Sequence, residues 1–181
     1  MSAPQSPRRR APGSRREPHA HPKGASSWED EIRHHLRSGF VLLGVGSRMR
    51  GDDGAGSVVA ERLAARGVPN AFDCGGVPEN YAGLVAKLQP PDVLFVDAVD
   101  FGKPPGSVEL FGGQSFQAQS VSTHSAGLSP LIEFLGASCS ALCWVLAIQP
   151  ADLAHGADLS PAVQKAVEQI VLSDVWLGLV R

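Results

Sequence analysis

Residues 41–56, VLLGVGSRMRGDDGAG, decide the fold of this chain because they join a buried strand to a helix through a glycine-rich turn. The apolar run of residues 40–44 predicts a strand that is covered on both faces. After the turn, apolar residues recur at near-helical spacing over residues 55–66, and Gly67 predicts the end of that helix. A strand, a glycine turn and a helix in this order are typical of α/β proteins.

Glycine turns after strands commonly bind phosphate, but the residue types here argue against it. Gly46 and Gly51 have the spacing of a P-loop, yet Asp52 and Asp53 stand where Lys and Ser or Thr are required. The dinucleotide fingerprint fails as well, because Met49 occupies the position of its third glycine. Two carboxylates would repel phosphate, so the sequence predicts no nucleotide site.

The rest of the chain alternates between strand-like and helix-like segments. Further strands are expected at residues 71–74, 93–96, 108–111 and 142–148, and further helices at 28–36, 80–88, 128–135 and 160–172. Ser160 and Pro161 suit the N-cap and first turn of the last helix, and residues 112–126 are predicted to form a polar loop. This pattern predicts a three-layer α/β/α fold with a twisted, mostly parallel sheet of about five strands.

Composition and cysteine content point to one cytoplasmic domain. With 181 residues, of which 43% are hydrophobic and 19% charged, the chain can bury a core of ordinary size. No apolar run approaches the roughly 18 residues that a membrane span needs, and no signal-peptide core is seen at the N-terminus. The three cysteines are too few for a disulfide framework, and a buried or inert role is expected rather than a metal pair of Cys139 and Cys143.

The N-terminal segment differs from the remainder of the chain. Residues 1–23 hold six of the 16 Lys and Arg residues and, in Glu17, one of the 18 acidic ones. We expect residues 1–26 to be a disordered basic tail rich in Pro and Arg, and residues 27–181 to be one domain. The run RRRAPGSRR is compatible with a nucleic-acid tether or with a solvated tail that has no partner, and the second is favoured.

Polar side chains suited to chemistry follow three of the expected strands. Asp52 and Asp53 follow the first strand, Asp97 follows the strand at residues 93–96, and His124 lies in the loop after the next strand. Because open parallel sheets bind ligands at the carboxyl ends of their strands, we expect these side chains to meet at one edge. Carboxylates and an imidazole are donors that suit a divalent ion such as nickel or zinc, with positions left for water or substrate.

Each of these residues also has an ordinary structural interpretation. Asp52 can cap the helix that follows, Asp97 can end its strand and cap the next turn, and His124 can be a satisfied loop histidine. A nucleophilic triad is disfavoured because the chain lacks a nucleophile elbow and the serines lie next to the histidine in sequence. That triad would consist of Ser122 or Ser125, His124 and Asp97.

Several motifs, in order along the chain, resemble those of the hydrogenase maturation endopeptidases. Proteins of this family trim the C-terminal extension from the large subunit of nickel–iron hydrogenases. The resemblance covers about residues 40–172. Its motifs are LLGVGSRMRGDDGAG, DCGGVPEN, VDAVDFGKPPG, STHSAGL and AIQP.

The resemblance implies a site, a substrate and a metal. The positions that match the family's metal-binding and catalytic residues are Asp53, Asp97 and His124. The loop that the family uses for substrate recognition corresponds to Asp73, Gly75 and Gly76. The glycines of the turn at residues 44–56 would let the substrate backbone approach closely.

The substrate implied is the large-subunit precursor, which carries the nickel, although another divalent metal is also compatible. The resemblance implies an endopeptidase of aspartic or metal-engaging type, and we expect a monomer. The alternative is a non-catalytic, chaperone-like module that senses metal loading without cutting.

Overall fold

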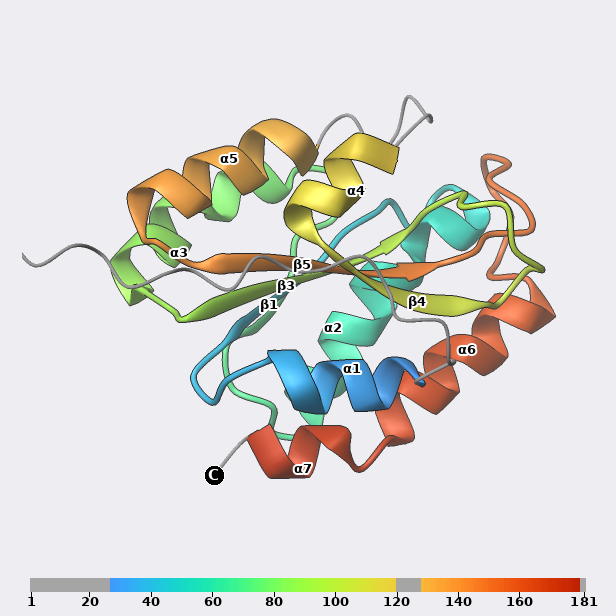
Figure 1. The fold of residues 1–181 in the computed structure, drawn as a ribbon. Coiled ribbons are helices and arrows are strands. Elements are labelled where there is room, and N and C mark those ends of the chain that lie inside the picture. Colours follow the sequence, from blue (N-terminus) through green and yellow to red (C-terminus); the bar gives the residue numbers. More distant parts are fainter. Residues whose placement is uncertain (1–26, 120–127, 180–181) are drawn as a thin grey trace, which may run out of the picture.

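The structure, a computed structural model, describes residues 27–119 and 128–179 of the chain. Within them, five strands form one sheet in the order β2-β1-β3-β5-β4, with helices on both faces (Figure 1). Neighbouring strands run parallel except β4 and β5, which are antiparallel. The predicted three-layer fold with a mostly parallel sheet is therefore confirmed. The strands are β1 (Val41–Gly44), β2 (Ala71–Asp73), β3 (Asp92–Ala98), β4 (Val108–Gly112) and β5 (Leu142–Ile148).

The helices divide between the two faces of the sheet (Figure 1). One face carries α1 (Trp28–His35), α2 (Ala55–Ala65), α6 (Pro161–Leu172) and α7 (Val175–Leu179). The other face carries α3 (Ala82–Leu88), α4 (Gly113–Gln119) and α5 (Leu128–Ser138). Two short 3-10 helices, η1 (Gly51–Gly54) and η2 (Pro78–Tyr81), precede α2 and α3.

The apolar side chains of the strands pack into two cores, one on each face of the sheet. In β1, Leu42 packs with the helices of the first face, whereas Val41 and Leu43 pack with those of the second. In β3, Leu94 and Phe95 divide in the same way. Side chains alternate across a strand, so burial on both faces requires a continuous apolar run.

Two helices were not predicted from the sequence. The expected polar loop at residues 112–126 is helical in its first part, as α4, and α7 follows the expected last helix. Among residues 113–116, the part of α4 whose side chains are described, Phe116 reaches the core, where it lies against Phe111. A single apolar residue cannot show helical periodicity, so the sequence gives no sign of this helix. The helix depends on tertiary packing instead.

Several sequence-based expectations fall on parts of the chain that the structure does not describe. The tail predicted for residues 1–26 lies outside the described residues, as do His124, Ser122 and Ser125. Among the helices of residues 27–119 and 128–179, none has the length and apolarity needed to cross a membrane.

The three cysteines are free thiols, as expected. Cys74 and Cys139 are buried and Cys143 is half-buried. Burial raises the pKa of Cys74 to about 12, aided by the charge of Asp73, and burial likewise raises the pKa of Cys143 to about 12. Thiols with such pKa values are not ionised at neutral pH and are inert. The described part of the chain contains no group of three His, Cys, Asp or Glu residues that could hold a metal ion.

Candidate active site

The carboxyl ends of β1, β2 and β3 bring three segments of the chain together. In the sheet register, Gly44 at the end of β1 lies beside Asp73 of β2 on one side and Val96 of β3 on the other. The turn that carries Asp53, the loop after Asp73, and Asp97 therefore lie at one edge of the sheet. The prediction that Asp53 and Asp97 share this edge is confirmed, whereas the third predicted member, His124, lies outside the described residues.

Asp97 is a buried carboxyl group close to a second carboxyl group. It lies near the end of β3, is only 7% exposed, and accepts a hydrogen bond from the backbone of Ala98. Burial raises the pKa of Asp97 to about 7, and the negative charge of Asp53 contributes in the same direction. Near neutral pH, Asp97 therefore exists in both protonated and ionised forms, which is the condition for a general acid or base.

Asp53 is held by the turn that contains it. The backbone N–H of Ser47 donates to Oδ2 of Asp53 at 2.7 Å, so the start of the turn orients the carboxylate at its end. Neither η1 nor α2 has a side-chain cap, so the interpretation of Asp52 as the cap of the following helix is wrong.

Asp52 has a different role from its neighbour. Its fully buried carboxylate accepts hydrogen bonds from the backbone N–H groups of Ala151, Asp152 and Ser160, and from the Ser160 hydroxyl, at 2.6–3.0 Å. Burial alone would raise the pKa of Asp52, but these hydrogen bonds outweigh it and hold the pKa below its usual value. Asp52 thus fixes the segment between β5 and α6. Ser160 is the N-cap residue of α6 as predicted, but its hydroxyl bonds Asp52 rather than capping the helix.

The glycines of the first turn are required by the packing of the chain itself. A Cβ atom on Gly46, where φ is +116°, would stand 1.7 Å from the carbonyl oxygen of Asp53. One on Gly56 would stand 2.0 Å from the carbonyl oxygen of Val96. The expectation that these glycines admit a substrate backbone is therefore wrong, because neighbouring backbone already fills the space.

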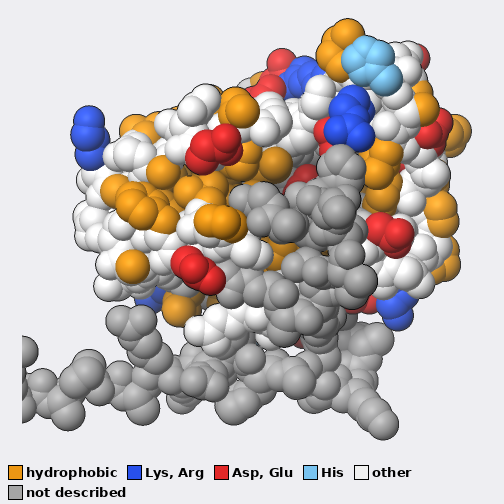
Figure 2. Space-filling model, turned by 90° about the horizontal axis from the view of Figure 1, so that it is seen from above, with side chains coloured by type: hydrophobic (Ala, Val, Ile, Leu, Met, Phe, Trp, Pro, Cys, Tyr) orange, Lys and Arg blue, Asp and Glu red, His pale blue; other side chains and the backbone are white. Residues whose placement is uncertain are grey.

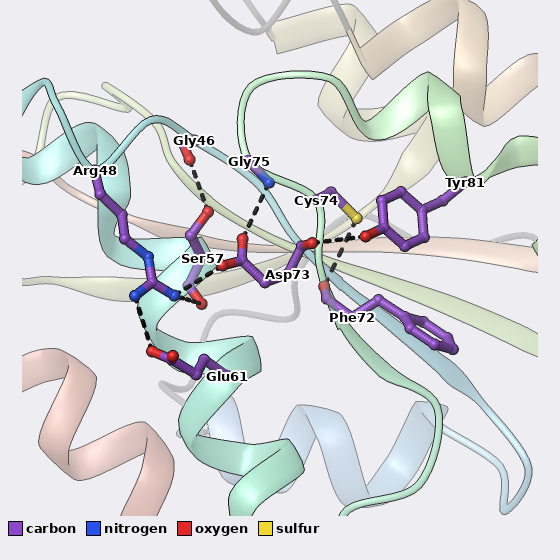
Figure 3. Close-up of polar contacts among 9 residues, drawn as sticks. All are labelled: Gly46, Arg48, Ser57, Glu61, Phe72, Asp73, Cys74, Gly75 and Tyr81. Carbon is purple, nitrogen blue, oxygen red and sulfur yellow. Dashed lines mark hydrogen bonds and ion pairs between the residues drawn. The ribbon is translucent and has the colours of Figure 1, made fainter.

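The second glycine loop is different. Side-chain atoms added at Gly75 or Gly76 would meet nothing within 4 Å, so this loop borders open space. Asp73 shapes the loop, since its Oδ1 accepts the N–H of Gly75 at 3.0 Å (Figure 3). The other carboxylate oxygen, Oδ2, accepts a hydrogen bond from Arg48 at 2.8 Å. Both oxygens of Asp73 therefore have partners within the chain.

A cleft of about 480 Å³ extends from Asp97 between η2, α3 and α5. Figure 2, which views the molecule from this side, shows hydrophobic side chains gathered on the face with a few acidic ones among them. Among the described residues, Asp97 and Glu79 are the charged side chains that line the cleft. Its apolar walls include Pro78, Ala82, Leu128, Leu131 and Phe134.

Three features of this edge were missed by the sequence analysis. Arg48 is one of two arginines in a polar turn, and such residues carry no motif signal. Gln149 lies in the AIQP motif and holds the loop after β3: its Nε2 donates to Asp100, and its Oε1 accepts the N–H of Phe101 and of Lys103. The cleft itself was also missed, because its walls come from segments that are far apart in the sequence.

Comparisons with known proteins agree with this arrangement. A family model described as hydrogenase maturation protease matches residues 58–173. The chain is 34% identical over 133 residues to the hydrogenase 3 maturation protease of Escherichia coli, an alignment that covers 72% of this chain and 85% of that protein.

A more distant relative and a solved structure give the same result. A putative hydrogenase maturation protease of Methanocaldococcus jannaschii is 26% identical and is aligned over 61% of this chain and 72% of its own length. The crystal structure of the [NiFe] hydrogenase maturation protease HycI from Thermococcus kodakarensis is 28% identical in sequence, with a TM-score of 0.68, and the match covers 79% of this chain and 92% of that one.

Proposed function

Since the chain belongs to the hydrogenase maturation protease family, we propose that it removes the C-terminal extension of a nickel–iron hydrogenase large-subunit precursor after nickel insertion. The observation that carries the proposal is the coupled carboxyl pair, Asp53 and Asp97, beside an open cleft at the carboxyl edge of the sheet. A protease needs both a group that handles protons and a place for the peptide, and these lie together here.

The two carboxyl groups suit a substrate that carries a divalent cation. Carboxylate oxygens bind divalent first-row metals, and a cation between two carboxylates removes their mutual repulsion. The nickel of a loaded precursor therefore favours ionised Asp97, whereas a nickel-free precursor leaves the repulsion in place. This difference in binding selects the loaded precursor. His124 remains the predicted third ligand and lies outside the described residues.

We assign the proton transfers of peptide hydrolysis to Asp97. Ionised Asp97 can take a proton from the attacking water and return that proton to the leaving amine, and burial, which raises its pKa to about 7 in the chain without substrate, favours the protonated state in between. Asp53 stays oriented by the N–H of Ser47 and presents its charge to the cation of the substrate. The apolar walls of the cleft hold the residues around the scissile bond and limit the access of water.

The test compares nickel-loaded with nickel-free precursor. The purified chain is incubated with each, and the mass of the large subunit is measured. We expect loss of the extension from the loaded precursor only, and no loss with the variant Asp97→Asn. Binding of the loaded precursor without any change of mass would instead support the non-catalytic, metal-sensing module.

A further inference from the structure

We infer that Arg48 is a positioning residue that clamps two loops of the site against each other. The first is the turn after β1, which carries Asp53, and the second is the loop after β2, which contains Gly75 and Gly76. The inference rests on the proposed function, because it assigns the clamp a part in processing. Arg48 lies within the motif LLGVGSRMRGDDGAG, but the resemblance assigns no role to its side chain.

The guanidinium group of Arg48 contacts three residues in two elements, Asp73 at the end of β2 and both Glu61 and Ser57 in α2 (Figure 3). Its Nη2 donates to Oδ2 of Asp73 at the end of β2, at 2.8 Å. Its Nη1 lies 2.9 Å from Oε2 of Glu61 in α2, and Nη2 is also 3.3 Å from the carbonyl oxygen of Ser57. The fixed fork of an arginine can hold such a three-way contact, which the single charge of a lysine cannot reproduce in full.

On the side of the turn after β1, the contacts of Arg48 extend to Asp53. The residue before Arg48, Ser47, donates its N–H to the Asp53 carboxylate at 2.7 Å. The backbone of Arg48 also lies against Gly54, where an added Cβ would stand 2.8 Å from the Cα of Arg48. A shift of Arg48 therefore moves the backbone group that orients Asp53.

On the side of the loop after β2, the contacts of Arg48 extend to the cleft. Asp73 accepts the Arg48 hydrogen bond on Oδ2 and the N–H of Gly75 on Oδ1. A backbone hydrogen bond of 2.8 Å from Gly46 to the carbonyl oxygen of Gly75 ties the same two loops together. Gly76, the next residue, lines the cleft together with Asp97. Asp73 thus affects the cleft through the loop whose conformation it holds.

The clamp contributes little to the stability of the fold. The side chains of Arg48 and Asp73 are 42% and 37% exposed, and ion pairs this accessible to water have little effect on unfolding. Added Cβ atoms at Gly75 and Gly76 would meet nothing within 4 Å, so this part of the loop is held by hydrogen bonds, which include that of Asp73 and the backbone bond from Gly46. The clamp therefore sets local geometry, and a misplacement of about 1 Å in such a site costs up to roughly 100-fold in rate.

The experiment measures kcat and KM for processing of the nickel-loaded precursor. We expect Arg48→Met and Asp73→Asn each to lower kcat about tenfold, with KM changed less than about twofold, because the apolar cleft still binds the substrate. The double variant should be no slower than either single variant, since the two residues act as a unit. Arg48→Lys should recover part of the loss. Arg62→Met, which removes an exposed arginine of α2, is the matched control.

Two further measurements separate the clamp from the proposed function. Thermal unfolding should show nearly equal Tm for all variants, and amide hydrogen exchange at Gly75 and Gly76 should accelerate in Arg48→Met but not in Arg62→Met. If Arg48→Met shows amide hydrogen exchange at Gly75 and Gly76 at the wild-type rate, or a wild-type kcat, the inference that Arg48 clamps the two loops is wrong. If the wild-type chain processes no precursor while exchange still accelerates in Arg48→Met, the proposed function fails and the clamp stands as a structural device.

Discussion

The negative charge of Asp53 acts on the carboxyl group of Asp97 and, after burial, is the second cause of its raised pKa of about 7. The two residues lie on neighbouring segments, Asp53 in η1 and Asp97 near the end of β3. Their coupling is electrostatic, so a change at one residue alters the protonation of the other. The first two predictions test this coupling.

Asp97→Asn should change how stability depends on pH. In the wild-type chain, native Asp97 keeps its proton between pH 3.8 and about 7 while the unfolded chain loses it, so the free energy of unfolding falls as the pH rises through this window. Asn is neutral at every pH and retains an oxygen that can accept the Ala98 N–H. The variant should match the wild type near pH 4 and exceed it at pH 8 by at most about 4 kcal/mol. Denaturant unfolding with a chelator present measures this, and equal stability at pH 8 would contradict the burial argument.

Asp53→Asn should abolish processing without weakening the fold. Loss of the charged partner removes a group proposed to meet the substrate's cation, and we expect the rate to fall about 100-fold or more. The same change removes repulsion on Asp97, so the pKa of Asp97 should move down toward its usual value. The mass of the large subunit reports the first effect and the pH dependence of unfolding reports the second. Processing at the wild-type rate would exclude Asp53 from the site.

Asp52→Asn should destabilise the chain. The buried carboxylate accepts four hydrogen bonds, and an amide presents one acceptor oxygen and an NH₂ group that faces other donors. We expect a loss of about 2–4 kcal/mol in the free energy of unfolding at pH 7. Because the pKa of Asp52 is held low, its contribution is present above about pH 4 and is lost as the pH falls through that low pKa. The gap between wild type and variant should therefore narrow in acid. A variant as stable as the wild type at pH 7 would show that this anchor is dispensable.

Phe134→Ser should weaken substrate binding. Phe134 lines the cleft and is 49% exposed, so the substitution removes apolar surface that can contact a peptide while costing the core little. We expect KM to rise roughly tenfold with kcat nearly unchanged. Leu177→Ser is the matched control, because Leu177 is 62% exposed and lies in α7 on the opposite face of the sheet. A similar effect of both variants would argue against the cleft as the peptide site.

The sequence alone was sufficient to predict the fold class and one edge of the sheet. Continuous apolar runs require burial on both faces, and crossovers between parallel strands bring their carboxyl ends together. These rules place Asp53 and Asp97 at one edge of the sheet, and the register of β1 and β3 confirms it. Such inferences succeed because the apolar periodicity of each segment and the alternation of strands with helices are visible in the sequence itself.

Only the tertiary structure showed that Asp52, the neighbour of Asp53, anchors the segment between β5 and α6. The partners of Asp52 lie about 100 residues further along the chain, and Arg48 meets Asp73 across 25 residues. The structure also explains Gly46, where a side chain would collide with the backbone of the chain itself. It likewise shows that Phe116 packs α4 against the core, although the sequence of that segment has no helical periodicity. Hydrogen bonds, buried charges and close packing depend on distances in space, and residue spacing along the chain does not encode those distances.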